Sequence, residues 1–155
     1  MTQATTALIV LVLVLLCGSA WVAIRIFEWR QVFRPDRKVL RTPEEVGLSY
    51  TPIRFVAEDS TFLQGWWVPA ENAAGTLIYL HGSGGNMGDR VEVLRDLHRL
   101  GLNLFTFDYR GYGDSRGIPT EQGLYRDARA AFEVVRSQHD DADDPPVIAY
   151  GRSLG

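Results

Sequence analysis

Apolar residues follow two different patterns along the chain. Residues 7–24 form one apolar run without a charged side chain, whereas residues 45–155 alternate short apolar segments with turn-forming residues. As a helix, the first run would be about 27 Å long, which is close to the hydrocarbon thickness of a bilayer. The pattern therefore predicts an apolar helix followed by one α/β domain.

The flanks of the apolar run favour a retained transmembrane anchor, which we assign to residues 1–30, with residues 7–27 in contact with the lipid bilayer. Trp21 and Arg30 supply the aromatic and basic side chains that hold a helix at the headgroup level. A cleaved signal peptide remains the alternative, because the small residues at 18–20 resemble a cleavage site. The chain begins, however, without the basic residues that usually open such a peptide.

The charge distribution predicts how this helix is oriented. Residues 25–41 carry six basic and two acidic side chains, whereas the whole chain has a net charge of −3. Basic residues after the apolar run, with none before it, predict a cytoplasmic domain by the positive-inside rule. We treat residues 31–44 as a basic juxtamembrane linker that suits anionic lipid headgroups. The residues that follow position 41 carry no broad excess of basic side chains, so we expect no nucleic-acid partner.

The segments after residue 45 alternate between strand and helix patterns. Apolar, β-prone segments predict strands at 49–57, 62–69, 76–80, 102–107 and 147–150. The first two are joined by four polar residues and predict an antiparallel hairpin. Apolar residues at helical spacing predict one helix ending at Gly101 and a second capped by Thr120. This order indicates a mainly parallel sheet with helices on both faces, entered through a hairpin.

A candidate nucleophile directly follows the last predicted strand. Gly151-Arg152-Ser153-Leu154-Gly155 fits the pattern G-x-S-x-G, in which a strained strand-to-helix turn exposes a serine hydroxyl at the end of a sheet. Glycine is needed two residues to either side because a Cβ there would collide with neighbouring backbone. The pattern predicts Ser153 as the nucleophile, supported by Gly151 and Gly155.

A second glycine-rich segment, His81-Gly82-Ser83-Gly84-Gly85-Asn86, follows the strand at 76–80. Acyl transfer needs two backbone N–H groups directed at the developing oxyanion, one after the nucleophile and one in the loop after an earlier strand. We expect the N–H groups of Leu154 and Ser83 to form this oxyanion hole, in a loop supported by the remaining residues, His81, Gly82, Gly84 and Gly85.

The same segment has two other interpretations. A phosphate-binding loop is disfavoured because Met87 stands where G-x-G-x-x-G requires its third glycine, and no lysine follows. A glycine-rich turn without chemistry remains open.

The order of these segments resembles a known family. HGSGGN at 81–86, DYRGYGDS at 108–115 and GRSLG at 151–155 are similar to the amino-terminal half of an α/β-hydrolase. The apolar amino-terminal helix and LQGWWVPA at 63–70 resemble, more narrowly, the membrane-anchored serine hydrolases of the Bem46-like group. The resemblance covers residues 45–155.

The resemblance implies a fold and a set of site residues. The fold class is α/β, the amino-terminal half of an α/β-hydrolase sheet, with an antiparallel entry hairpin, then parallel strands with covering helices, preceded by one transmembrane helix. The implied nucleophile is Ser153, and the implied oxyanion hole is formed by the backbone N–H groups of Ser83 and Leu154.

The acid and base of the triad are the main departure from the family pattern. In this fold both follow the nucleophile in sequence, whereas the histidines of this chain are His81, His98 and His139. We expect a structural role for His81, a solvent-facing position for His98 and a place in an acidic loop for His139. Residues 45–155 are therefore interpreted as a partial domain, and the chain taken alone is expected to be inactive and prone to aggregate.

The sequence thus predicts a membrane-anchored serine hydrolase that cleaves a carboxylic ester or thioester, with an acyl chain near the membrane, through an acyl-enzyme. No cofactor and no metal is expected. Two alternatives stay open, a non-catalytic membrane-tethered binding protein of the same fold and a peptidase of that fold, because the fold alone does not select the chemistry.

Overall fold

A computed structural model describes residues 3–138 and 146–155 and divides the chain into two compact units, Met1–Arg34 and Pro35–Gly155. The boundary between them falls within a two-residue strand, β1 (Arg34–Pro35). The boundaries of the predicted anchor (1–30), linker (31–44) and hydrolase domain (45–155) remain predictions.

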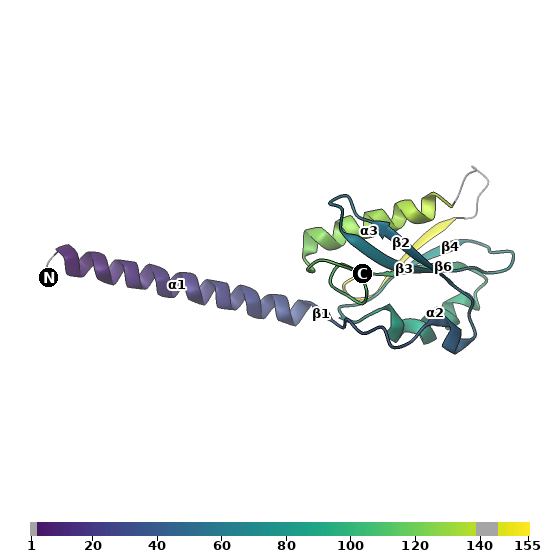
Figure 1. Ribbon diagram of the computed structural model, residues 1–155, viewed down its shortest axis with the longest axis horizontal. Helices are drawn as coiled ribbons and strands as arrows, with labels where there is room; N and C mark the ends of the chain where they lie inside the picture. Colours follow the sequence, from purple (N-terminus) through teal and green to yellow (C-terminus); the bar gives the residue numbers. More distant parts are fainter. Residues whose placement is uncertain (1–2, 139–145) are drawn as a thin grey trace. The chain divides into compact units, whose positions relative to one another are not determined.

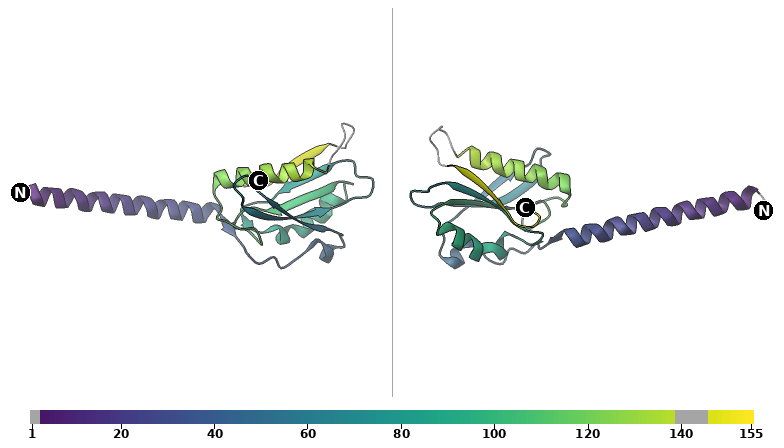
Figure 2. Two further views of the ribbon diagram at one scale, coloured as in Figure 1. Left: turned by 45° about the horizontal axis from the view of Figure 1, so that its top comes forward. Right: turned by 180° about the vertical axis from the view of Figure 1, so that it is seen from behind.

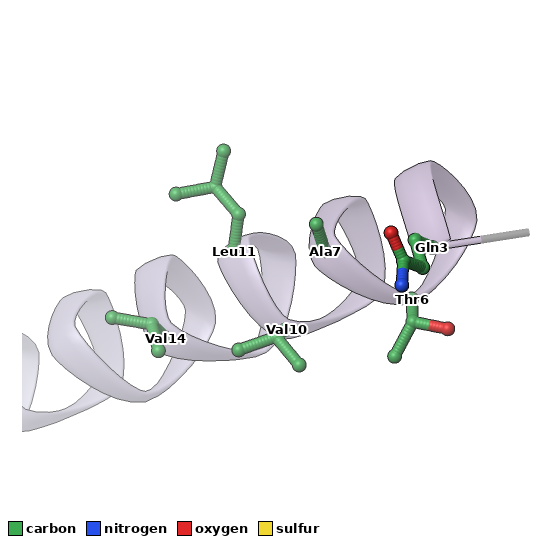
Figure 3. A pocket seen from close by; sticks show the side chains of 6 residues that line it. All are labelled: Gln3, Thr6, Ala7, Val10, Leu11 and Val14. Carbon is green, nitrogen blue, oxygen red and sulfur yellow. The ribbon is translucent and has the colours of Figure 1, made fainter.

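The first unit consists of helix α1 (Gln3–Val32), which is apolar on all sides. Figure 3 shows Ala7, Val10, Leu11 and Val14 projecting from successive turns of this one helix. A helix without a polar face suits lipid, because it has no single stripe to bury against protein. Its length and composition are sufficient to cross a membrane, although an amino-terminal signal sequence meets the same criteria.

The second unit is built on a five-stranded sheet of order β2-β3-β6-β4-β7. Its strands are β2 (Thr51–Val56), β3 (Phe62–Val68), β4 (Thr76–Leu80), β6 (Asn103–Asp108) and β7 (Val147–Gly151). β2 and β3 form the predicted antiparallel hairpin, and β3 is also antiparallel to β6. β4 runs parallel to both β6 and β7, so the parallel part of the predicted sheet is confirmed as well.

Helices α2 (Val91–His98) and α3 (Glu121–Arg136) cover opposite faces of this sheet (Figures 1 and 2). Alternation along β6 divides its side chains between the two faces, as the pleat of a strand requires. Leu104 belongs to the buried cluster that includes residues of α2, whereas Phe105 stacks with Phe107 and contacts Phe55 of β2. The predicted cap of α3 is present, since the Thr120 hydroxyl accepts a hydrogen bond from the Gly123 N–H at 3.1 Å.

The remaining elements are short and lie in the connections: η1 (Pro43–Val46), β5 (Gly84–Gly85) and η2 (Met87–Arg90). Because β4, β6 and β7 are parallel, their carboxyl ends lie at one edge of the sheet, and the three glycine-rich motifs follow those ends. In the part of the sheet that the structure describes, β7 is an edge strand, and its Ile148 and Tyr150 are exposed.

Candidate active site

The candidate nucleophile lies in a sharp turn at the end of β7. Ser153 is exposed and has a φ of 58°, in the left-handed region that L-residues other than glycine rarely adopt. A Cβ on Gly151 would collide with the backbone of Gly155, and a Cβ on Gly155 would collide with the backbone of Leu80 in β4. The turn therefore requires both glycines, and it holds one serine in the strained conformation expected of a nucleophile elbow.

The loop at 81–87 lies against this turn, and we call it the oxyanion loop after the donor that the sequence predicts in it, Ser83. A Cβ built on Gly82 would be 3.3 Å from the Arg152 carbonyl oxygen and 3.5 Å from Ser153 Cβ. The Arg152 N–H donates to the Leu80 carbonyl oxygen at 3.0 Å, which fixes the end of β4 against the turn. Two motifs that are about seventy residues apart in the sequence are thus neighbours in the fold.

The two predicted oxyanion donors are half-buried residues on either side of this contact. Among the hydrogen bonds of the described residues, none uses the N–H of Ser83 or Leu154 as its donor. Free N–H groups in this position are available to an external oxygen, as an oxyanion hole requires.

His81 is enclosed, and both of its ring nitrogens have neighbours. Its Nδ1 lies 2.8 Å from the Gly82 carbonyl oxygen, and its Nε2 lies 3.2 Å from Oδ1 of Asp108. Because a carbonyl oxygen only accepts, the contact with Gly82 places a proton on Nδ1. Burial raises the pKa of Asp108, although the hydrogen bond with His81 opposes that shift. These contacts join the loop at 81–87 to Asp108, and the structural role of His81 stays a prediction.

Asp108 joins the oxyanion loop to the loop at 108–115. Besides the contact with His81, its Oδ1 accepts a hydrogen bond from the Met87 N–H at 2.7 Å. The Tyr112 hydroxyl, on the same 108–115 loop, donates to the Ser83 carbonyl oxygen at 2.9 Å. The oxyanion loop is thus attached at its beginning, middle and end to one neighbouring loop.

The glycines of the oxyanion loop differ in what they require. Gly85 has a φ of 78°, and a Cβ there would collide with the Asp89 carboxylate. A Cβ on Gly84 would meet nothing within 4 Å, so the fold itself does not demand glycine there. Glycine at 84 leaves space beside the loop, whereas glycine at 85 is needed for its backbone turn.

A charged network holds the 108–115 loop to α3 and to the β2–β3 turn. The Arg110 guanidinium donates to Asp127 at 2.7 Å and to Asp59 at 2.8 Å. The hydrogen bonds from Arg110 hold the pKa of Asp59 well below its usual range. Asp127 is fully buried, and burial raises its pKa despite the bonds from Arg110. This network is structural and fastens the loop that supports the site to two neighbouring elements.

The structure describes no further histidine beside Ser153. The Nε2 atom of His98 lies 2.8 Å from the Pro69 carbonyl oxygen, so this partly buried ring is not simply solvent-facing. The prediction for His139 concerns a residue outside those described. Within residues 3–138 and 146–155, no group of three or more His, Cys, Asp or Glu side chains is arranged to hold a metal ion.

Sequence reasoning missed the contribution of Asn86 and Tyr112 to this site. In the sequence Asn86 is the last residue of a glycine-rich segment, whereas in the structure its side chain is 2% exposed and fully engaged in hydrogen bonds. Tyr112 belongs to the DYRGYGDS segment at 108–115, and nothing in that segment singles out its hydroxyl. The available signal was position, because both residues follow the carboxyl ends of parallel strands.

Comparison with known proteins places these features in context. The family model described as serine aminopeptidase, S33, matches residues 71–155. An uncharacterized protein, YfhR, of Salmonella typhi is 39% identical over 129 residues, which cover 79% of this chain and 42% of that protein. The bem46 protein of Schizosaccharomyces pombe is 32% identical over 124 residues, covering 77% of this chain and 41% of its own length.

A lipid-cleaving relative and a solved structure match the same region. The lysophosphatidylserine lipase ABHD12 of Gallus gallus is 35% identical over 138 residues, covering 75% of this chain and 35% of that protein. The structure of an esterase of Pyrococcus furiosus superposes with a TM-score of 0.68 at 26% identity, covering 79% of this chain and 49% of that one. The chain thus spans about two fifths of the length of the curated relatives it matches.

Proposed function

The chain belongs to the α/β-hydrolases, in the serine aminopeptidase family and with Bem46-like relatives, and on this premise we propose that it supplies the nucleophile and the oxyanion hole of a membrane-anchored serine hydrolase. The predicted family and fold class are confirmed. The site residues, the acyl-enzyme and the anchor belong to the proposal.

The observation that supports the proposal most strongly is the conformation of Ser153. A non-glycine residue at a φ of 58° is strained, and the strain persists because Gly151 and Gly155 allow a turn that no other residues would fit. Strain of this kind gathers where it serves a site, and here it lies next to the Leu154 N–H, which donates no hydrogen bond among the described residues.

In the proposed reaction, the Ser153 hydroxyl loses its proton to a general base and its oxygen attacks the carbonyl carbon of the substrate. The resulting oxyanion accepts hydrogen bonds from the Ser83 and Leu154 N–H groups. The C–O or C–S bond then breaks, the alcohol or thiol leaves with a proton, and water releases the acid from the acyl-enzyme. His81 is not the base, because its ring nitrogens face Gly82 and Asp108.

We propose a carboxylic ester or thioester with an acyl chain as the substrate. Relatives named as a lysophosphatidylserine lipase and as an esterase support ester cleavage. α1 as an anchor of residues 1–30 would keep the domain at 45–155 near acyl chains, and the basic residues at 31–44 favour its cytoplasmic side. Peptide cleavage is the second candidate, since the matching family model is described as an aminopeptidase.

A fluorophosphonate probe tests this proposal, because it reacts with an activated serine and not with an ordinary hydroxyl. The complete gene product in isolated membranes is expected to be labelled at Ser153, and Ser153→Ala is expected to lose the label. Acyl p-nitrophenyl esters and aminoacyl p-nitroanilides then separate esterase from peptidase activity. A folded domain that is never labelled would instead favour a tethered binding protein.

A further inference from the structure

We propose that residues 36–38, which we call the strap, position the oxyanion loop, and that Asn86 is the positioning residue that fastens the strap to it. This inference rests on the proposed function. It gives a role in the site to a segment that the sequence presents only as a basic linker after the apolar helix.

The backbone of Asp36 joins the two loops that form and support the site. Its N–H donates to the Gly85 carbonyl oxygen at 3.1 Å, on the oxyanion loop. Its carbonyl oxygen accepts from the Gly113 N–H at 2.9 Å, on the 108–115 loop. One residue therefore holds both loops through main-chain hydrogen bonds, which do not depend on the identity of its side chain.

Asn86 provides the second attachment. Its side-chain NH₂ group donates to the Lys38 carbonyl oxygen at 2.8 Å and to the Asp36 carbonyl oxygen at 3.3 Å. Its Oδ1 accepts from the Gly88 N–H at 2.9 Å, which caps η2. The position needs two donors and an acceptor at once, and an amide side chain supplies that combination.

Further contacts at Arg37 and at the neighbouring Val39 hold the strap against the domain. The Arg37 guanidinium donates to the Ser115 carbonyl oxygen at 2.6 Å. Beside the strap, Val39 lies 3.0 Å from the place of a Cβ on Gly113 and 3.2 Å from that of a Cβ on Gly88, so both glycines accommodate it. The oxyanion loop therefore depends on a segment about fifty residues earlier in the chain.

The contribution of the strap should appear in the chemical step. Oxyanion donors stabilise the transition state more than the bound substrate, so a displaced donor lowers kcat while KM changes little. Full loss of one such donor costs about 100-fold to 1,000-fold in kcat. A loosened loop that still samples its correct position should cost less, about tenfold to a hundredfold.

Asn86→Asp removes the side-chain hydrogen bonds to the strap and keeps the one that caps η2. The carboxylate still accepts from the Gly88 N–H, but it replaces the NH₂ donor with an oxygen that faces two carbonyl oxygens. Asn103→Asp is the matched control, because Asn103 also uses its amide in two hydrogen bonds but lies at the opposite end of β6 from the site.

Three measurements are made on the complete gene product in membranes or mild detergent. They are the rate of fluorophosphonate labelling, kcat and KM for p-nitrophenyl butyrate, and amide hydrogen exchange over residues 81–87. For Asn86→Asp we expect labelling and kcat to fall by about tenfold to a hundredfold, KM to stay within about twofold, and exchange to accelerate. For Asn103→Asp we expect labelling within about twofold of the unaltered protein, since it touches neither loop.

Equal labelling, kcat and exchange in Asn86→Asp and the unaltered protein would overturn the inference. If Asn86→Asp does not fold, Arg37→Gln serves instead, because it removes a hydrogen bond of the strap and changes no residue of the oxyanion loop. An unchanged labelling rate and unchanged hydrogen exchange in Arg37→Gln would likewise overturn the inference. Absence of labelling in the unaltered protein would refute the proposed function instead, and hydrogen exchange would still decide whether the strap holds the loop.

Discussion

Removing the Arg110 guanidinium tests how the loop that supports the site is held in place. Arg110→Met keeps most of the apolar stem but leaves the carboxylate of Asp127, which is fully buried, without its charged partner. Breaking a buried ion pair from one side typically costs about 3–5 kcal/mol. Asp59 adds at most about 1 kcal/mol, because its side chain is 32% exposed. We therefore expect the variant to lose about 4 kcal/mol of unfolding free energy.

Urea unfolding followed by tryptophan fluorescence, in mild detergent at pH 7.5, measures this loss. With a slope near 2 kcal/mol per molar urea, 4 kcal/mol shifts the midpoint by about 2 M. The double variant with Asp127→Asn should recover much of the loss, because it no longer buries an unpaired charge. The deficit of Arg110→Met should also shrink toward pH 4.5, since burial raises the pKa of Asp127 and protonation removes the charge. A variant within 1 kcal/mol of the unaltered protein at pH 7.5, with no dependence on pH, would refute this reasoning.

Three further changes probe the turn, the network and the loop. Gly155→Ala places a Cβ against the backbone of β4 and should abolish fluorophosphonate labelling with little change in α/β content by circular dichroism; normal labelling would show that the turn tolerates the side chain. Because Arg110 lowers the pKa of Asp59 below its unfolded value, Asp59 stabilises the fold above about pH 4, and that contribution is lost as pH falls through its folded pKa. Asp59→Asn should therefore flatten the acid limb of stability measured by urea unfolding at pH 2–6, and an unchanged limb would contradict the assignment. Tyr112→Phe removes the hydroxyl that donates to Ser83, and calorimetry should detect a loss of about 1–2 kcal/mol; an unchanged midpoint would show that the bond contributes nothing.

Local pattern was sufficient to predict the strands and the turn that exposes Ser153. The strand at 76–80 was predicted with its observed bounds, and that at 147–150 within one residue, because each is an apolar segment stopped by glycine or a turn. The conformation of residues 151–155, at the end of β7, is equally local, since Gly151 and Gly155 are required by contacts within the turn and with the adjacent strand.

The order of strands and the supports of the site could not be predicted in the same way. β6 lies between β3 and β4, an arrangement that no single segment specifies. The hydrogen bonds from Asn86 to Asp36 and Lys38 join positions about fifty residues apart. They form only once the oxyanion loop and the strap lie side by side in the folded domain. Residue type alone gives no sign of such contacts, because an asparagine after a glycine-rich turn is equally suited to an exposed loop.

The central claim is that Ser153 is an activated nucleophile, and site mapping of a covalent probe tests it most directly. The complete gene product, in its own membranes, is treated with a fluorophosphonate, digested and examined by peptide mass spectrometry, with Ser153→Ala treated in parallel. We expect modification at Ser153 and its disappearance in the variant. A folded protein in which the peptide containing Ser153 is recovered unmodified after saturating treatment would contradict it.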